Sequence, residues 1–381
     1  MIILGIYESH HAGAALYDDY ELIAAVAQER VTRIKGDGER FPAEAVSECL
    51  AQAGLPAERI EAVAMSRGYY PDSYFTARSR WPAPVPRGQA RNLMKAMTRQ
   101  WIFDPARAFD ARRFLADHGL HPGRISFYNH HLAHALAALF HTDYDDALIY
   151  TSDGGGDRVY YSARRLVGGR LKVLFGGEAG SRSLRRNNDA DSLGQLYAVA
   201  TEVLGFRRLR HEGKVLGLAA FGEPIHAPAI LRHYRVRGDG QIRADVRLRE
   251  IAAELRAMAV GARREDIAAS VQQVLEQLTL ASLDRLYQRD RPRNLALSGG
   301  VFANVKLTQR IAERFPFDEV FVYPAMSDQG EAAGGVLQLL LERDGLGTFS
   351  PGGKSSAIFI SAAITWRERT KRSRAAARRA S

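Results

Sequence analysis

The sequence has little cysteine and lacks long apolar runs. Its single cysteine, Cys49, cannot form an internal disulfide bond, which excludes both a disulfide framework and a cysteine-rich metal cage. No run of about 18 apolar residues occurs, as a transmembrane helix requires, and the first residues lack the basic region and apolar core of a secretory signal peptide. We therefore expect a cytoplasmic protein with no membrane partner.

The rest of the composition is that of an ordinary globular protein. The 381 residues are 46% hydrophobic and 25% charged, which is enough apolar material for one or two cores and excludes a disordered or fibrous chain. A formal net charge of +10 would suit a nucleic-acid partner, but residues 367–381 hold seven Lys or Arg and one Glu and so supply +6 of it. Because the other residues carry only +4, we expect no nucleic-acid partner.

Two segments, residues 2–27 and 147–175, share one pattern. Each has the pattern of three short apolar strands joined by tight turns, with a first turn rich in small residues, and each is followed by helical periodicity. This order is expected of two related α/β lobes around a nucleotide cleft, although a simple β-meander would give it too. Further on, alternating elements indicate a parallel α/β lobe, with helices over 192–204, 266–289, 301–315 and 329–342 and strands over 295–297 and 320–323.

A cluster of histidines is the strongest local signal. On a helix, His130 and His134 are four residues apart and share a face, so their imidazoles can bind one metal ion. Asp153 and Asp328 follow predicted strands, and loops at the carboxyl ends of strands are where ligands bind in open α/β folds. The alternative is a surface or helix-capping histidine cluster.

Glycines mark three further candidate sites. In residues 153–157, three glycines lie between two aspartates. Such glycines let backbone N–H groups approach phosphate oxygens, beside a carboxylate that can hold a metal ion. The alternative is that this segment only forms a tight hairpin. In residues 297–304, paired glycines lie between a strand and a helix N-terminus, an arrangement that favours anion binding. The alternative is that the glycines only allow the strand and the helix to pack closely. In residues 211–217, Lys214 between glycines offers a positive charge to phosphate, or belongs to a solvated loop.

These motifs occur in a characteristic order along the chain. They are Gln28-Glu-Arg-Val-Thr-Arg33 with Lys35 and Phe41-Pro42, His130-His-Leu-Ala-His134-Ala135, Ser152-Asp-Gly-Gly-Gly-Asp157, Leu204-Gly-Phe206 with His211-Glu-Gly-Lys-Val215, Leu297-Ser-Gly-Gly-Val-Phe-Ala-Asn304, and Ser327-Asp-Gln-Gly330. Over residues 1–345 the order resembles the O-carbamoyltransferases of nodulation-factor, cephamycin and aminoglycoside biosynthesis.

The resemblance implies a fold and an activity. The fold is an α/β, actin-like ATPase fold over residues 1–345, with two related lobes at about 1–145 and 146–345, as in the similar tRNA threonylcarbamoyl-transfer enzymes. The activity is transfer of a carbamoyl group from carbamoyl adenylate, made from ATP and carbamoyl phosphate, to a hydroxyl of a small-molecule acceptor such as a natural product or sugar. The implied cofactor is a divalent metal ion, Fe²⁺ first, with Zn²⁺ and Mn²⁺ as alternatives.

The resemblance also assigns residues by position. The metal ligands would be His130, His134, Asp153 and Asp328, and the nucleotide would be lined by Gly154, Gly155, Gly156, Lys214, Gly299, Gly300 and Asn304. His10 and His11 would lie near the transferred group as candidate proton acceptors. The family's first loop is usually His-Asp-x-Ser-Ala, whereas here His11 and Gly13 replace the Asp and the Ser.

The resemblance stops near Gly345. Residues 346–381 have the composition of a linker and a basic tail without apolar positions, which we expect to be poorly ordered. They stand where the family has a second domain that makes carbamoyl adenylate. We therefore expect either a separate protein that supplies the adenylate, or a truncated or frame-shifted product.

Three functions stay open at this point. The first is a transferase domain that uses an adenylate made elsewhere, and the second is a catalytically incomplete nucleotide-binding remnant or partner subunit. The third is a tRNA-modifying relative, which the basic residues 207–210 would suit. Residues 69–114, rich in aromatic and arginine side chains, are expected to form part of the acceptor pocket or else an ordinary helical insertion.

Overall fold

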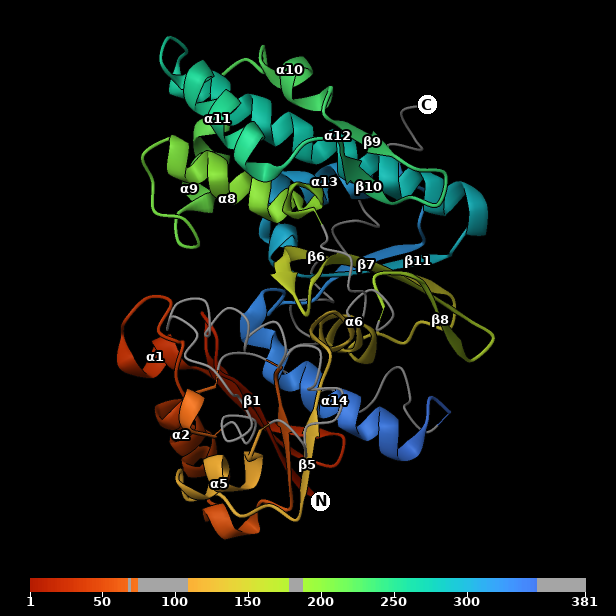
Figure 1. Ribbon diagram of the computed structural model, residues 1–381. Coiled ribbons are helices and arrows are strands. Elements are labelled where there is room, and N and C mark those ends of the chain that lie inside the picture. The colour runs from red at the N-terminus through yellow and green to blue at the C-terminus, as the bar shows by residue number, and fades with distance from the viewer. Residues whose placement is uncertain (68–69, 75–108, 178–187, 348–381) are drawn as a thin grey trace, which may run out of the picture. The chain divides into compact units, whose positions relative to one another are not determined.

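The computed structural model describes residues 1–67, 70–74, 109–177 and 188–347, and these residues form two compact units (Figure 1). The first unit comprises Met1–Asp143 and the described residues from Asp328 on, and the second comprises Tyr144–Ser327. Most of the expected acceptor wall over 69–114 and nearly all of the expected linker and tail over 346–381 lie outside the described residues. Within the described ranges, no helix combines the length and apolarity needed to cross a membrane.

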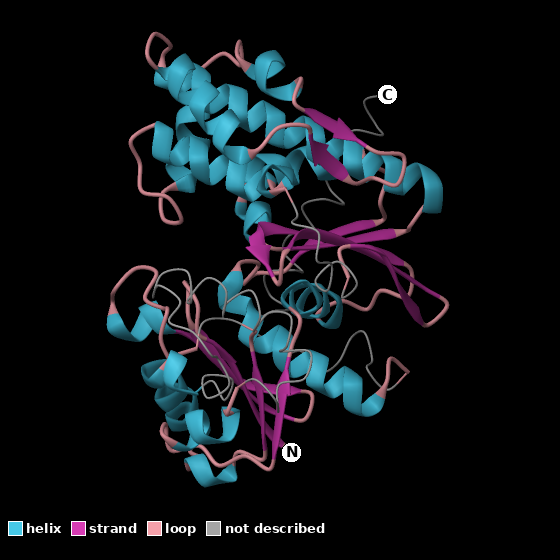
Figure 2. Ribbon diagram, viewed as in Figure 1, coloured by secondary structure: helices cyan, strands magenta, loops and turns pink. Residues whose placement is uncertain are grey.

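The first unit is built on a β-sheet, whose strands are magenta in Figure 2. The sheet has five strands in the order β3-β2-β1-β4-β5. Antiparallel pairing joins β1, β2 and β3, and parallel pairing joins β1, β4 and β5. The strands are β1 (Ile2–Tyr7), β2 (Gly13–Asp18), β3 (Glu21–Ala27), β4 (Ala62–Met65) and β5 (Arg124–Phe127). The predicted three-strand pattern at the start of the chain is therefore confirmed.

Side-chain alternation along β1 separates two layers. Ile2, Leu4 and Ile6 belong to an apolar core that also takes in residues of α2 and α5. The intervening residues face the opposite side, where α14 packs against Gly5. The helices of this unit are α1 (Gln28–Thr32), α2 (Ala43–Ala53), α5 (Ala111–Ala116), α6 (His130–Phe140) and α14 (Glu331–Asp344), with short 3₁₀ turns η1 (Ala57–Arg59), η2 (Asp72–Tyr74) and η6 (Asp328–Gly330).

Glycines bring α14 unusually close to its neighbours. A Cβ atom on Gly5 would lie 2.0 Å from the Ala332 carbonyl oxygen, and one on Gly334 would lie 2.2 Å from the Ala133 carbonyl oxygen of α6. One on Gly335 would lie 2.2 Å from the ring of Tyr128. Real side chains do not approach so closely, so α14 can contact both β1 and α6 only because these positions lack side chains.

The second unit repeats the sheet, with the order β12-β11-β6-β7-β8. Its strands are β6 (Ala147–Gly156), β7 (Val159–Val167), β8 (Arg170–Phe175), β11 (Asn294–Ser298) and β12 (Glu319–Val322), and a separate hairpin pairs β9 (Tyr234–Val236) with β10 (Ile242–Ala244). Its helices are α8 (Leu193–Val203), α9 (Glu212–Ala219), α10 (Ala227–Leu231), α11 (Leu248–Ala259), α12 (Arg264–Asp290) and α13 (Val305–Arg314), with the turns η4 (Asp189–Asp191) and η5 (Gly300–Ala303). One apolar core, which includes Leu196, Leu275 and Leu297, joins the helices to the sheet.

The two sheets have the same topology. In each, the first strand lies in the middle, its antiparallel meander lies on one side, and two parallel strands lie on the other. This repeat confirms the expected fold class, an actin-like pair of related α/β lobes.

Two details of the expected elements differ from the structure. The segment from Asp328 on, expected in a lobe over 146–345, belongs to the first unit, because α14 packs against α6 and β1. The helix expected over 301–315 is interrupted at Asn304, whose side chain accepts a hydrogen bond from the Leu307 N–H and so caps α13.

We predict that Gly334→Ala lowers the free energy of unfolding by about 1–3 kcal/mol, because the added methyl group must displace α14 from α6. Gly217→Ala in α9 is the matched control, since a Cβ there meets nothing within 4 Å and Ala favours a helix over Gly by up to about 1 kcal/mol. Urea unfolding of both variants measures the difference. A Gly334→Ala variant as stable as Gly217→Ala would contradict the close packing.

Candidate metal centre

The two predicted histidine ligands lie on one face of α6. The side chain of Asn129 caps this helix by accepting a hydrogen bond from the Leu132 N–H, so that the first helical residue is His130. The four-residue spacing then brings the rings of His130 and His134 to 4.7 Å between centroids, and both side chains are buried.

Asp328 faces both imidazoles from η6, the turn that precedes α14. Its Oδ1 atom lies 3.8 Å from Nε2 of His130 and 3.6 Å from Nε2 of His134. One candidate ligand atom from each of the three residues falls within 4.8 Å of the others. Asp328 is only 2% exposed, and its Oδ1 has no hydrogen-bond partner among the described residues. A buried, unsatisfied carboxylate oxygen beside two imidazole nitrogens is the arrangement that a cation would complete.

Tyr7 and His10 contact the other oxygen of Asp328. The Tyr7 hydroxyl donates a 2.5 Å hydrogen bond to Oδ2, because alternation along β1 places Tyr7 on the α14 side with Gly5. Nε2 of His10 lies 3.4 Å from the same oxygen, and its side chain is 37% exposed. His10 therefore connects the buried carboxylate with the protein surface.

The loop that carries His10 is closely packed. His11 adopts a left-handed backbone conformation with φ of 63°. A Cβ on Gly38 would lie 2.0 Å from the Ser9 carbonyl oxygen, and the same oxygen accepts a hydrogen bond from the Glu39 N–H at 3.2 Å. These contacts restrict where the loop can place its two histidines.

A second carboxylate, Glu331, lies behind the imidazoles. Its Oε2 lies 3.4 Å from Nδ1 of His130 and its Oε1 lies 3.2 Å from Nδ1 of His134, with the side chain wholly buried. Neither Glu331 nor Tyr7 was identified from the sequence. Glu331 could have been found as a charged residue at the start of the apolar helix that follows Asp328. Tyr7 could have been found from the alternation of side chains along β1.

Electrostatics keep Asp328 charged and Tyr7 protonated. Burial alone would raise the pKa of Asp328, but its interactions with the neighbouring His134, His130 and His10 side chains hold it well below its usual range. Burial raises the pKa of the Tyr7 hydroxyl, and the neighbouring Asp328 charge raises it further. The tyrosine therefore donates and the aspartate accepts at neutral pH.

In the second unit, the predicted glycine loops meet at Asp153. Its Oδ1 accepts a hydrogen bond from the Gly154 N–H at 2.5 Å, and its Oδ2 accepts one from the Gly300 N–H at 3.2 Å. Gly299, with φ of 101°, allows this approach, because a Cβ there would lie 2.2 Å from the Ser152 carbonyl oxygen. Asp153, Gly154, Gly299 and Gly300 thus come together at the carboxyl ends of β6 and β11.

Helix α8 supports the same loop. The Ser192 hydroxyl donates to the carbonyl oxygens of Asp153 and Gly154, and the Gln195 amide donates to that of Gly154 at 2.9 Å. Arg208, from the basic stretch 207–210, donates in turn to Oε1, the side-chain oxygen of Gln195. This arginine therefore has a structural partner within the unit.

The other predicted nucleotide residues lie on nearby elements of the second unit. Gly155 has φ of 138° and Gly156 ends β6. Lys214 is exposed on α9, with its Nζ 5.7 Å from the centre of the Phe206 ring. Asn304 is largely buried and exchanges hydrogen bonds with Gln272 while it caps α13, so both of its side-chain groups have structural partners.

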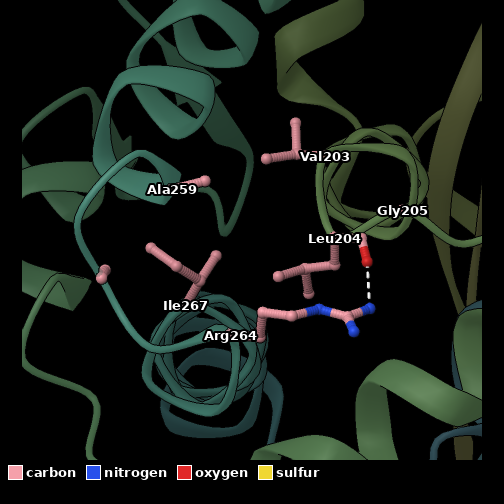
Figure 3. A pocket seen from close by; sticks show the side chains of 7 residues that line it. Val203, Leu204, Gly205, Ala259, Arg264 and Ile267 are labelled. Carbon is pink, nitrogen blue, oxygen red and sulfur yellow. Dashed lines mark hydrogen bonds between the residues drawn. The ribbon is translucent and has the colours of Figure 1, made fainter.

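A cavity of about 400 Å³ opens elsewhere in the second unit (Figure 3). It lies between the end of α8 and the α11–α12 connection, and the Arg264 guanidinium at its edge donates to the Leu204 carbonyl oxygen. It is lined by Val203, Leu204, Gly205, Ala259, Ala262, Arg264 and Ile267. None of the predicted site residues lines it.

Comparisons with known proteins point to one family. Residues 2–337 match the family model described as Carbamoyltransferase N-terminus. Nodulation protein NolNO of Sinorhizobium fredii is 30% identical over 346 residues, which are 87% of this chain and 46% of the relative. The uncharacterized protein sll1178 of Synechocystis is 29% identical, over 88% of this chain and 56% of the relative. The chain thus spans about half the length of these relatives.

Among solved structures, HypF of T. kodakarensis is similar over 91% of this chain and 48% of its own, with 13% identity and a TM-score of 0.49.

We predict that Tyr7→Phe lowers the free energy of unfolding of the metal-free protein by about 1.5–3 kcal/mol, because it removes a hydrogen bond to a charged, buried acceptor. Tyr150→Phe is the matched control: its buried hydroxyl meets the neutral Ser282 hydroxyl at 3.1 Å, so the loss there is about 0.5–1.5 kcal/mol. Urea unfolding followed by circular dichroism gives both values. A smaller loss for Tyr7→Phe than for Tyr150→Phe would show that the Tyr7–Asp328 contact is not charge-assisted.

Proposed function

The chain belongs to the carbamoyltransferase N-terminus family, and from this membership we propose that it transfers a carbamoyl group from carbamoyl adenylate to a hydroxyl of a small-molecule acceptor. The observation that carries the proposal is the buried convergence of His130, His134 and Asp328 in the first unit. Because the chain spans about half of its curated relatives, we propose that the adenylate is made from ATP and carbamoyl phosphate by another domain or a separate protein.

The residues of the centre fit a divalent metal ion. Imidazole nitrogens and carboxylate oxygens are donors typical of Fe²⁺, Zn²⁺ and Mn²⁺ sites, and of these we propose Fe²⁺ first. We propose His130, His134 and Asp328 as ligands, with Asp153 of the second unit as the fourth. When bound, the ion supplies positive charge that stabilises the adenylate phosphate and the leaving AMP.

The nucleotide part of the donor is proposed to bind at the glycine loops of the second unit. The proposed contacts are Gly154, Gly155 and Gly156 at the end of β6 and the Gly299–Gly300 pair after β11, where Gly155 and Gly299 have positive φ. The exposed Lys214 adds a positive charge for phosphate. Asn304 contributes by holding the start of α13 behind these glycines.

Proton transfer is assigned to the first loop. The acceptor hydroxyl oxygen bonds to the carbamoyl carbon, the bond from that carbon to the phosphate oxygen breaks, and the hydroxyl proton passes to an imidazole nitrogen. His10 suits this role, because Asp328 orients its ring while more than a third of its side chain remains exposed. His11, which replaces the family's aspartate, is the second candidate.

We predict that His130→Ala and Asp328→Ala abolish metal retention and lower carbamoyl transfer at least about 100-fold when synthetic carbamoyl adenylate is supplied. Elemental analysis and a mass-spectrometric transfer assay measure the two effects, and the exposed His121→Ala on the same unit is the control. The wild-type chain is expected to use carbamoyl adenylate but not ATP plus carbamoyl phosphate.

Full activity and metal content in both alanine variants would refute the site assignment. A wild-type chain inactive with both donors would instead identify a nucleotide-binding remnant or partner subunit.

A further inference from the structure

The cavity in the second unit has the size of a small-molecule site. Its volume is about 400 Å³, and it lies between the end of α8 and the connection from α11 to α12 (Figure 3). Pockets that bind small molecules typically measure about 300–1,000 Å³. The cavity is therefore large enough to take up a ligand of modest size.

Apolar side chains make up most of the cavity wall. Val203, Ala259 and Ile267 lie around one space. The backbone N–H of Gly205, which also lines the cavity, already donates to the Glu202 carbonyl oxygen at 2.9 Å. Because such a wall offers water few hydrogen bonds, an apolar group is the favoured occupant.

One charged group lies at the edge of this apolar wall. The Arg264 guanidinium donates to the Leu204 carbonyl oxygen, and its central carbon lies 4.8 Å from the centre of the Phe206 ring. These two contacts hold the guanidinium in place. Within the described part of the chain, the bond to Leu204 uses only one of its five N–H groups. The others remain available to a ligand.

The charges around Arg264 leave it without a carboxylate. Arg263 forms ion pairs at 3.8 Å with both acidic residues in the first turn of α12, and Arg256 forms one at 3.3 Å with Glu202. Arg264 takes part in no ion pair with any residue that the structure describes. A guanidinium in this state, beside an apolar wall, is complementary to an anion that carries an apolar body.

We propose that this cavity binds a small carboxylic acid with an apolar chain or ring. The carboxylate accepts hydrogen bonds from Arg264, whose planar guanidinium matches a carboxylate, and one arginine balances one negative charge. The apolar body lies against Val203, Ala259 and Ile267. No residue assigned to the metal ion or the nucleotide lines this cavity, so the inference does not depend on the proposed function.

The test is a titration with sodium octanoate of the full chain, labelled with ¹³C at the methyl groups of isoleucine, leucine and valine. NMR spectra are expected to show saturable shifts at Val203, Leu204 and Ile267, whose methyl groups belong to the cavity wall. Octan-1-ol has the same chain but no charge, and it is expected to bind about tenfold more weakly, because it cannot form the charge-assisted hydrogen bonds. Octylamine, which has the opposite charge, is expected not to bind.

Two variants separate the charged and the apolar part of the site. Arg264→Gln is expected to weaken octanoate binding about tenfold and to leave octan-1-ol binding unchanged. Ala259→Leu fills apolar space and is expected to weaken the binding of both probes about tenfold or more. Arg314→Gln is the matched control, because Arg314 also lies over a phenylalanine ring, that of Phe315, but belongs to α13 and does not line the cavity.

Two results would overturn the proposal. One is the absence of saturable shifts at the cavity methyl groups when octanoate is added to the wild-type chain, a result that requires no variant to fold. The other is equal affinity of the wild-type chain for octanoate and octan-1-ol, which would show that the cavity takes up an apolar molecule without recognising a carboxylate.

Discussion

The close packing of α14 against β1 and α6 is the constraint on which the candidate centre depends. Gly5, Gly334 and Gly335 each leave space where a side chain would overlap a neighbouring backbone or ring. Because α14 can approach so closely, the residues at its start, Asp328 and Glu331, reach the imidazoles of α6 from two sides. Sheet topology alone would not bring these groups together.

That packing also buries the charged and polar side chains of the centre. Tyr7 reaches Asp328 because it shares a face of β1 with Gly5, and its hydroxyl donates to Oδ2, the oxygen that does not face His130 and His134. Two carboxylates, two imidazoles and one hydroxyl are thus held in an apolar interior. Such a group of buried polar side chains is costly for folding, and the proposed cation would offset part of that cost.

Much of the fold could be predicted from the sequence, because its signals are local. Apolar strands separated by tight turns indicated both meanders, and the spacing of His130 and His134 indicated a shared helix face. Contacts between distant segments were harder to predict. Glu331 packs behind the imidazoles, and Tyr7 packs against Asp328. Both contacts join segments more than 190 residues apart in the sequence, so the spacing of residues along the chain cannot predict them. For the same reason the segment from Asp328 on was expected in the other lobe.

We propose above all that His130, His134 and Asp328 together bind one metal ion. X-ray absorption at the metal edge of the full chain loaded with Fe²⁺ or Zn²⁺ tests it most directly. Two imidazole ligands and carboxylate oxygen are expected at about 2.0–2.2 Å from the ion, with the imidazole signal reduced in His130→Ala. A metal ion surrounded only by oxygen, or an unchanged spectrum in that variant, would contradict it.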